Sequence, residues 1–267
     1  MKIEKIMLDN SAYLEAYIAD KTEKYTRKAI LVIPGGGYAG VSEREGEPIA
    51  LAFMSYGYNA FVLNYSVARE KSFPAQLIQA SKAMKHIKDN AEEYGIDKEE
   101  VFAVGFSAGG HLCASLGVMW NKKEIYEEVD IPYGYNKPKG IMLIYPVISG
   151  VSEFAHMGSF QNLFGTDTPS EEQLKEASIE LNMWSESSPA YIVHAANDTV
   201  VPVENSLIIA EEYSKHKIPF EMHIYPKGEH GFSLANKITW DGNPEFIQEE
   251  DAKWIENAVK WAEKLTF

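Results

Sequence analysis

The sequence of 267 residues has a single cysteine, Cys113, and no long apolar run. One thiol cannot close a disulfide within the chain, so no disulfide framework is predicted. A helix that crosses a membrane needs about 18 consecutive apolar residues, and the first residues also lack the apolar core of a secretory signal. We therefore expect a cytoplasmic protein with no membrane partner.

Positive charge is also scarce. The chain has 25 Lys and Arg residues against 39 Asp and Glu residues, which gives a formal net charge of −14. Such an excess of negative charge repels phosphate backbones, so we expect no nucleic-acid partner. The histidines and the cysteine show neither H-x-x-x-H nor C-x-x-C spacing, and we predict no metal site and no cofactor.

Short apolar runs alternate with stretches that have apolar residues at helical spacing. The runs typical of buried strands cover residues 29–34, 60–66, 101–106, 141–146, 191–196 and 222–226. The helix-like stretches cover residues 47–57, 75–95, 108–120, 203–217 and 249–265. This alternation predicts the α/β class, with a mostly parallel sheet covered on both faces and function at the carboxyl ends of the strands. Before the first run, two partly alternating segments flank Asp9-Asn10-Ser11 and predict an antiparallel hairpin.

The chain is expected to form one domain over residues 1–267. No stretch rich in Pro, Gly or Ser divides it, and no internal repeat is present. Two polar segments with scattered aromatic residues, 121–139 and 149–187, interrupt the alternation of strands and helices. We expect both segments to lie over the carboxyl edge of the sheet and to shape a pocket there.

The stretch Gly105-Phe106-Ser107-Ala108-Gly109 matches G-x-S-x-G, and it stands where a predicted strand meets a predicted helix. In a nucleophile elbow the glycines relieve crowding in a sharp turn that raises the serine hydroxyl above the sheet. The alternative is that Ser107 only caps the helix. The position of the motif in the order of elements favours the nucleophile.

A serine nucleophile needs a base, and the base needs a carboxylate that fixes its tautomer. When the nucleophile sits on such an elbow, these partners follow it as an acid and then a histidine, each in a loop after a strand. Asp198 fits the acid, since it lies in a polar loop after the run 191–196. His230 fits the base, because its loop after the last predicted strand is flanked by glycine. His216 lies in a predicted helix tail, and we interpret it as a solvated surface residue. His223 lies in a predicted strand, and we interpret it as structural.

The other four histidines are interpreted as residues outside the catalytic set. His111 lies four residues after Ser107 on the same predicted helix, near the site but expected to pack. His86, His156 and His194 are expected to take no part.

Three consecutive glycines, Gly35, Gly36 and Gly37, follow the first buried run. No G-K-[ST] pattern follows them, which argues against a phosphate site of the P-loop type. A glycine-rich turn at this place can direct backbone N–H groups at a developing oxyanion.

These motifs together resemble the α/β-hydrolase superfamily, and more narrowly the small esterases related to hormone-sensitive lipase and to acetyl-xylan esterases. The resemblance extends from PGGGY through GFSAGGH and HAANDTVVP to GEHGF. It implies Ser107 as nucleophile, His230 as general base and Asp198 as the orienting acid. It also implies an oxyanion hole built from the N–H groups of Gly36, Gly37 and Ala108. Pro34 replaces the histidine of the lipase-type H-G-G-G motif.

The expected activity is hydrolysis of short acyl esters on a small-molecule substrate, with acetyl groups on xylo-oligosaccharides or other sugars as the leading case. Two alternatives stay open: an amide hydrolase of the arylformamidase type, and a hydrolase fold that binds without catalysis. Four aromatic residues could stack on a sugar ring or simply wall the pocket: Tyr38, Tyr65, Tyr133 and Trp184. The oligomeric state is also open, since the N-terminal hairpin could pair with a second copy in a homo-oligomer.

Overall fold

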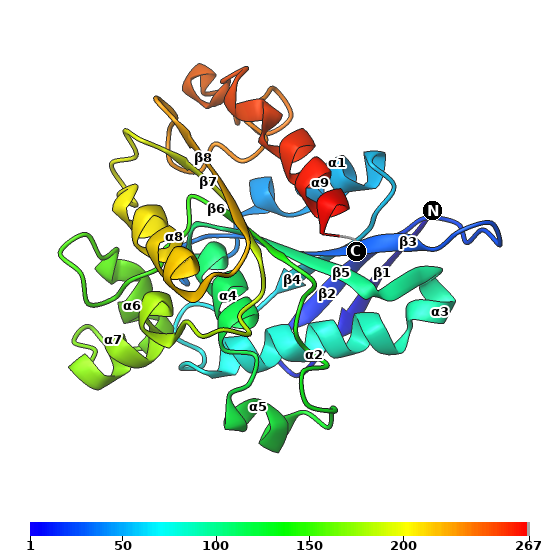
Figure 1. The fold of residues 1–267 in the computed structure, drawn as a ribbon, viewed down its shortest axis with the longest axis horizontal. Helices are drawn as coiled ribbons and strands as arrows, with labels where there is room; N and C mark the ends of the chain where they lie inside the picture. Colours follow the sequence, from blue (N-terminus) through cyan, green and yellow to red (C-terminus); the bar gives the residue numbers. More distant parts are fainter. Residues whose placement is uncertain (266–267) are drawn as a thin grey trace.

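The computed structural model describes residues 1–265 and contains a sheet of eight strands, in the spatial order β1-β2-β4-β3-β5-β6-β7-β8 (Figure 1). The strands are β1 (Lys2–Met7), β2 (Tyr13–Ile18), β3 (Arg27–Ile33), β4 (Asn59–Asn64), β5 (Ile96–Phe106), β6 (Ile141–Ile144), β7 (Ala190–Ala195) and β8 (Phe220–Tyr225). From β4 to β8 all neighbours are parallel, whereas β2 pairs antiparallel with both β1 and β4. The predicted fold class, including the N-terminal hairpin, is confirmed.

Helices cover both faces of the sheet (Figure 1). One face carries α1 (Glu47–Ser55) and α9 (Trp254–Lys264), and the other carries α2 (Ala75–Asp89), α4 (Ser107–Val118) and α8 (Glu204–His216). The remaining helices are α3 (Ala91–Tyr94), α5 (Lys123–Glu128), α6 (Met157–Phe164) and α7 (Glu171–Ala177). Short 3-10 turns are η1 (Glu43–Glu45), η2 (Ile179–Asn182), η3 (Pro244–Phe246) and η4 (Asp251–Lys253).

The apolar runs of the sequence are continuous because the central strands are buried on both faces. In β3, Ile30 and Val32 belong to the core under α1 and α9. Leu31 and Ile33 belong to the core under α2, α4 and α8. All four side chains are fully buried.

The segment 121–139 does not cover the carboxyl edge of the sheet, so that expectation is wrong. The segment leaves the carboxyl end of α4 and ends where the Lys139 N–H donates to the Val101 carbonyl, at the edge where β6 begins. The Asn136 amide donates to Ser81 of α2 at 3.1 Å, and α5 packs against α2. α4 starts at the carboxyl end of β5 and runs back toward the amino edge, so the segment that joins its carboxyl end to the next parallel strand stays at the amino edge.

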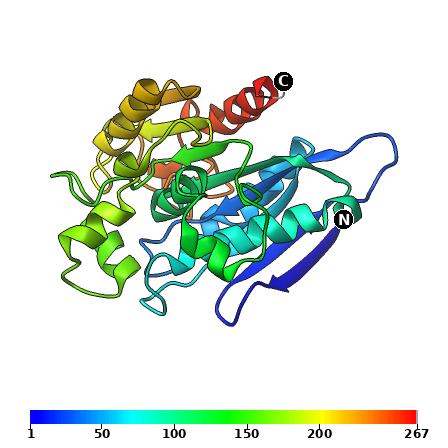
Figure 2. The ribbon, with the colours of Figure 1, turned by 60° about the horizontal axis from the view of Figure 1, so that its bottom comes forward.

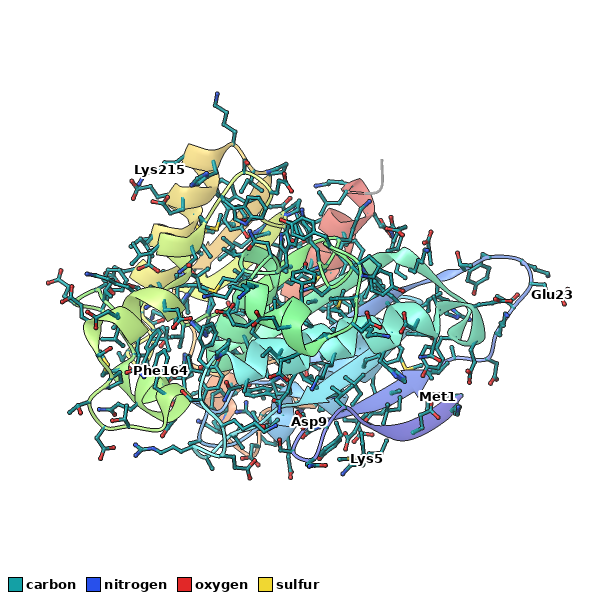
Figure 3. The ribbon with its side chains drawn as sticks, turned by 90° about the horizontal axis from the view of Figure 1, so that it is seen from below. Met1, Lys5, Asp9, Glu23, Phe164 and Lys215 are labelled. Atoms are coloured by element: carbon teal, nitrogen blue, oxygen red, sulfur yellow. The ribbon has the colours of Figure 1, made fainter. Side chains whose placement is uncertain are left out.

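The segment 149–187 does reach the carboxyl edge of the sheet, through α6 and α7. The Asn162 amide of α6 donates to the Gly37 carbonyl at 2.9 Å. The carbonyl of Ala177, the last residue of α7, lies 2.7 Å from His111 Nε2. Figures 1 and 2 show α6 and α7 at the end of the molecule opposite the N-terminus, and Figure 3 labels Phe164 of α6 and Met1 at these two ends.

Trp254 anchors α9 to the loop that follows β8, and its removal is expected to destabilise the fold. Its ring is fully buried, packs against Phe53 and Phe106, and donates from Nε1 to the Ser233 carbonyl at 2.8 Å. Truncation of such a side chain costs about 3–5 kcal/mol. We expect Trp254→Ala to lower the free energy of unfolding by that amount in urea titrations.

A suitable control is Leu51→Ala, which lies on α1 but is 43% exposed. This variant is expected to stay within about 0.5 kcal/mol of wild type. Equal losses in the two variants would contradict the assigned packing of α9.

Candidate active site

The strand order places a site between β3 and β5. The chain passes from β3 to β4 on one side and then returns to β5 on the other side of β3. In open α/β sheets such a reversal leaves a crevice at the carboxyl ends of the two strands. The glycine loop 35–37 follows β3, and Ser107 follows β5, so both predicted motifs meet at this crevice.

Ser107 stands on a strained turn. Its φ is +52°, a left-handed conformation that side chains other than glycine rarely adopt. A Cβ on Gly105 would lie 2.2 Å from the Gly109 carbonyl oxygen, and a Cβ on Gly109 would lie 2.2 Å from the carbonyl oxygens of Ile33 and Pro34. Both glycines of the motif are therefore required by the close approach of α4 to β3 and β5.

The structure brings Ser107, His230 and Asp198 into one hydrogen-bonded chain. Ser107 Oγ lies 2.9 Å from His230 Nε2, and His230 Nδ1 lies 2.7 Å from Asp198 Oδ2. An ionised carboxylate only accepts hydrogen bonds, so Nδ1 carries the ring proton and Nε2 is free to accept from the serine hydroxyl. His230 and Asp198 come from the loops after β8 and β7, as their order in the sequence predicts.

The environment of Asp198 stabilises its ionised form. Burial by itself would raise the pKa of this carboxyl group, but hydrogen bonds from His194 and His230 and the charge of His230 outweigh it. Oδ1 also accepts from the N–H groups of Val200 and Val201, both at 2.9 Å. The pKa of Asp198 is therefore held well below its usual range.

His194 is a neighbour of the acid, which corrects the expectation that it takes no part. Its Nε2 lies 3.4 Å from Asp198 Oδ2 and donates to the Val201 carbonyl at 2.9 Å. Its Nδ1 lies 2.7 Å from Ser206 Oγ on α8. The sequence gives one signal of this contact: His194 stands four residues before Asp198, at the end of a buried run.

The glycine loop lies directly beside Ser107. A Cβ on Gly35 would be 3.0 Å from the Cβ of Ser107. Gly36 and Gly37 have φ values of +125° and +61°, and within residues 1–265 neither N–H group has an intramolecular acceptor. Ala108 lies in the first turn of α4, where N–H groups have no partner inside the helix. The three residues predicted to donate to an oxyanion thus lie at the same end of the crevice.

Of the two roles left open for Tyr38 and Tyr65, stacking on a sugar ring is excluded by their burial. Tyr38 and Tyr65 are 1% and 2% exposed, so neither ring offers a face to a ligand. The Tyr65 hydroxyl donates to the Pro34 carbonyl at 2.8 Å. The Tyr38 hydroxyl lies 2.8 Å from His111 Nδ1, and the two rings meet edge to face. Both tyrosines support the glycine loop from behind.

Trp184 lies far from Ser107, and the same holds for Tyr133. The Trp184 indole N–H donates to the Val118 carbonyl at the carboxyl end of α4. With a rise of about 1.5 Å per residue, this end lies roughly 16 Å from Ser107 at the start of the helix. Tyr133 packs near Trp184, on the ring of Trp120. Polar segments rich in aromatic residues occur at either edge of a sheet, and the sequence does not distinguish the two.

His111 is packed, as predicted, and it links three parts of the site. Its Nε2 donates to the Ala177 carbonyl, which leaves Nδ1 to accept the Tyr38 hydroxyl proton. Burial lowers the pKa of His111 to about 4, although the hydrogen bond to Ala177 acts in the opposite sense. The neutral ring therefore connects α4 to the glycine loop and to α7.

His156 is also closer to the site than predicted. Burial and then the positive charge of His230 lower the pKa of His156, whereas Asp198 acts to raise it. Its Nδ1 lies 2.9 Å from Ser159 Oγ, and the Ser159 hydroxyl faces Gly37. The sequence gives no sign of this neighbourhood, because His156 lies in a segment without regular periodicity.

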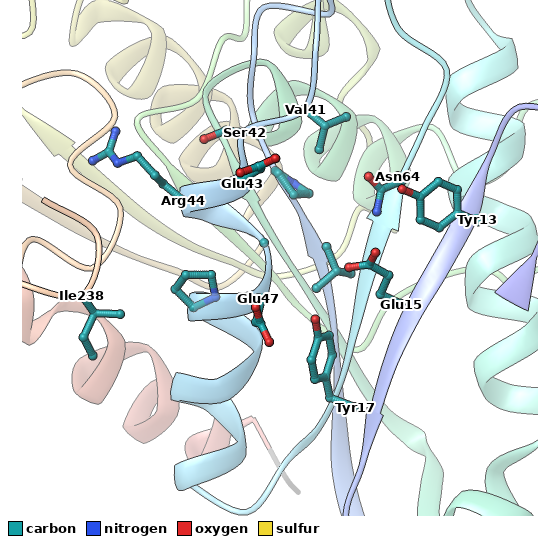
Figure 4. Close-up of a pocket in the computed structure, with 14 residues that line it drawn as sticks. Tyr13, Glu15, Tyr17, Val41, Ser42, Glu43, Arg44, Glu47, Asn64 and Ile238 are labelled. Carbon is teal, nitrogen blue, oxygen red and sulfur yellow. The ribbon is translucent and has the colours of Figure 1, made fainter. Parts of the chain in front are cut away.

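A cavity of about 540 Å³ lies behind the glycine loop, and none of the predicted site residues lines it (Figure 4). It lies between strands β2 and β4 and the segment 41–48. Carboxylates of Glu15, Glu43 and Glu47 surround it, together with Tyr17. Among the residues that the structure describes, no cluster of His, Cys, Asp and Glu is suited to a metal ion, and no helix is long and apolar enough to span a membrane.

Comparison with known proteins is consistent with this arrangement. The profile of the BD-FAE family matches residues 14–213. The chain is 38% identical over 234 residues to endo-1,4-beta-xylanase B of Butyrivibrio fibrisolvens, covering 86% of this chain and 36% of that protein. It is 28% identical over 242 residues to an acetylxylan esterase of Xylanibacter ruminicola, covering 88% of this chain and 46% of that protein. The chain thus spans less than half the length of these two relatives.

Solved structures match over nearly the whole chain. An acetyl ester-xyloside bifunctional hydrolase from Caldicellulosiruptor lactoaceticus has a TM-score of 0.84 and 33% identity, covering 99% of this chain and 97% of that chain. The carboxylesterase Cest-2923 from Lactobacillus plantarum has a TM-score of 0.85 and 25% identity, with coverage of 99% and 98%. These matches confirm the resemblance inferred from the motifs, and the chain belongs to the BD-FAE family of α/β hydrolases.

Proposed function

We propose that this protein is a serine carboxylic-ester hydrolase that releases short acyl groups through an acyl-enzyme. The observation that carries the proposal is the chain of contacts from Ser107 Oγ through the His230 imidazole to Asp198, at 2.9 and 2.7 Å. Both distances lie within the range needed for proton transfer and for orientation of the base. The relatives named as esterases support the same class of reaction.

In the first half of the reaction, Ser107 Oγ attacks the ester carbonyl carbon as His230 Nε2 takes the hydroxyl proton. The carbonyl oxygen becomes an oxyanion, and the N–H groups of Gly36, Gly37 and Ala108 are the proposed donors to it. The intermediate collapses when the bond to the leaving oxygen breaks, and His230 returns the proton to the departing alcohol. The acyl group is then esterified to Ser107.

In the second half, water attacks the acyl carbon and His230 accepts one of its protons. Collapse of the second intermediate returns that proton to Ser107 and releases the carboxylic acid. Asp198 keeps its negative charge throughout and stabilises the imidazolium form of His230. The low pKa of Asp198 fits this role, because the group stays ionised at neutral pH.

The proposed substrates are acetylated xylo-oligosaccharides or other acetylated sugars. Support comes from two proteins similar to this chain, one named acetylxylan esterase and the other acetyl ester-xyloside bifunctional hydrolase. His156 and Ser159 lie beside the glycine loop and could donate hydrogen bonds to sugar hydroxyls.

Ser107→Ala should abolish ester hydrolysis, because within residues 1–265 Ser107 carries the only hydroxyl bonded to His230. We expect kcat for p-nitrophenyl acetate to fall at least about 10⁴-fold. Ser115→Ala is the matched control, since Ser115 is buried on the same helix and its hydroxyl donates to the His111 carbonyl instead of His230. A wild-type rate in folded Ser107→Ala would refute the mechanism.

Wild-type turnover should be highest with p-nitrophenyl acetate and should fall steeply from butyrate to octanoate and laurate. We expect acetylated xylo-oligosaccharides to be deacetylated, with acetate release as the readout. Turnover of N-formylkynurenine but of no ester would instead indicate an amide hydrolase. Failure of a fluorophosphonate probe to label Ser107 would indicate a binding protein.

Asp198→Asn should affect both the rate and the pH dependence of stability. The amide no longer holds His230 in the required tautomer, so kcat should fall about 10⁴-fold. The pKa of Asp198 is lowered in the folded protein, so its contribution to stability is complete above the ordinary value of about 4 and is lost as the pH falls below it. Urea titrations should therefore show a smaller difference between variant and wild type at pH 3 than at pH 7. A constant difference would contradict the assigned ionisation.

A further inference from the structure

Three glutamates at alternate positions, Glu43, Glu45 and Glu47, follow the glycine loop, and they have different environments. Glu43 and Glu47 are exposed and line the cavity shown in Figure 4. Glu45 does not line that cavity and is 4% exposed. Within residues 1–265 it forms no ion pair, so neutral groups must stabilise its carboxylate. A buried charge of this kind is costly unless its hydrogen bonds are satisfied.

Two donors satisfy the Glu45 carboxylate, and they come from opposite sides of the crevice. Oε2 accepts the N–H of Gly35 at 2.8 Å, and Oε1 accepts the Tyr145 hydroxyl proton at 2.6 Å. Burial and the negative charge of Glu45 raise the pKa of Tyr145 well above its ordinary value, so the hydroxyl keeps its proton and remains a donor.

The first contact fixes the start of the glycine loop. The Gly35 N–H is bound by Glu45, and the Gly35 carbonyl accepts the Ser42 N–H at 2.9 Å. Both polar groups of the Gly35 backbone are therefore held by one short segment. The orientation of the peptide units that follow, at Gly36 and Gly37, depends on this anchor, and these units carry two of the proposed oxyanion donors.

The second contact fixes the wall behind the base. The Tyr145 ring meets the His230 ring edge to face, with centroids 5.1 Å apart, and packs on Phe232 at 4.7 Å. The Tyr145 hydroxyl also accepts the Ser233 N–H at 3.1 Å, three residues beyond His230. The loop that carries the base thus rests on the same phenol that donates to Glu45.

We infer that Glu45 is a positioning residue for catalysis, which acts through Gly35 on the oxyanion loop and through Tyr145 on His230. The inference rests on the proposed function of Ser107 and His230. Glutamine cannot replace Glu45, because its amide presents one acceptor and one donor to two groups that both donate. Either the Gly35 N–H or the Tyr145 hydroxyl proton would lose its acceptor, and the corresponding side of the crevice would shift.

The test compares Glu45→Gln and Tyr145→Phe with the control Glu43→Gln, a neighbour with the same side chain that faces the cavity instead. We expect kcat for p-nitrophenyl acetate to fall about 10- to 100-fold in both test variants, since loss of a full oxyanion donor costs about 10²–10³-fold. KM should change less than about threefold, because the misplaced groups act on the transition state. Glu43→Gln should retain wild-type kcat and KM.

The double variant Glu45→Gln/Tyr145→Phe separates a shared role from two independent ones. If the two side chains act as a unit, the double variant should lose no more activity than the worse single variant. Multiplied losses would show that Glu45 and Tyr145 act separately and would overturn the inference. So would a kcat within twofold of wild type in folded Glu45→Gln. If Glu45→Gln does not fold, the kcat of the nearly isosteric Tyr145→Phe variant tests the inference. A value within twofold of wild type would overturn it.

Ser107→Ala, measured in parallel, distinguishes a failure of the proposed mechanism from a failure of the positioning role. An active Ser107→Ala protein would refute the proposed mechanism whatever Glu45 does. An inactive Ser107→Ala protein together with a fully active Glu45→Gln protein would refute only the positioning role.

Discussion

The contact of the first turn of α4 with the carboxyl ends of β3 and β5 constrains every other group at the catalytic end. It is a contact between backbones, because a Cβ on Gly109 would lie 2.2 Å from two carbonyl oxygens of the β3 end. Any side chain there would push α4 away and would separate Ser107 from the loop that begins at Gly35. A displacement of about 1 Å can cost a catalyst 10²-fold in rate, so this spacing has to be met by glycine.

The acid and the base depend on a second constraint, the parallel alignment of β7 and β8. Asp198 and His230 are 32 residues apart in the sequence, and they meet because parallel strands end at the same edge of the sheet. The Asn197 side chain accepts the Gly228 N–H at 2.9 Å and ties the two loops together next to the Asp198–His230 pair. His194 and the N–H groups of residues 200 and 201 then hold the carboxylate, so its orientation does not rely on His230 alone.

The sequence was sufficient to predict the fold class and the three residues that meet at the crevice, since both follow from local patterns and chain order. Buried runs identify parallel strands, and residues after such strands collect at one edge. These local patterns do not predict which way an individual side chain points. Tyr38 directly follows the three glycines, and the left-handed turn at φ +57° directs its ring to His111 in the interior. Trp184 and the segment 121–139 were assigned to the wrong edge because composition does not record which end of α4 a loop contacts.

Glu45 is a residue whose proposed role could not be predicted from the sequence. It stands among three glutamates at alternate positions, and nothing in the sequence separates it from its exposed neighbours. Only the fold shows that Glu45 and Asp198 are both buried carboxylates whose ligands are hydrogen-bond donors of the catalytic end. Asp198 meets the His230 ring at Nδ1, Ser107 meets it at Nε2, and Tyr145, held by Glu45, packs against the ring. An imidazole contacted on these three sides has little freedom to turn, and two of the three contacts depend on a carboxylate.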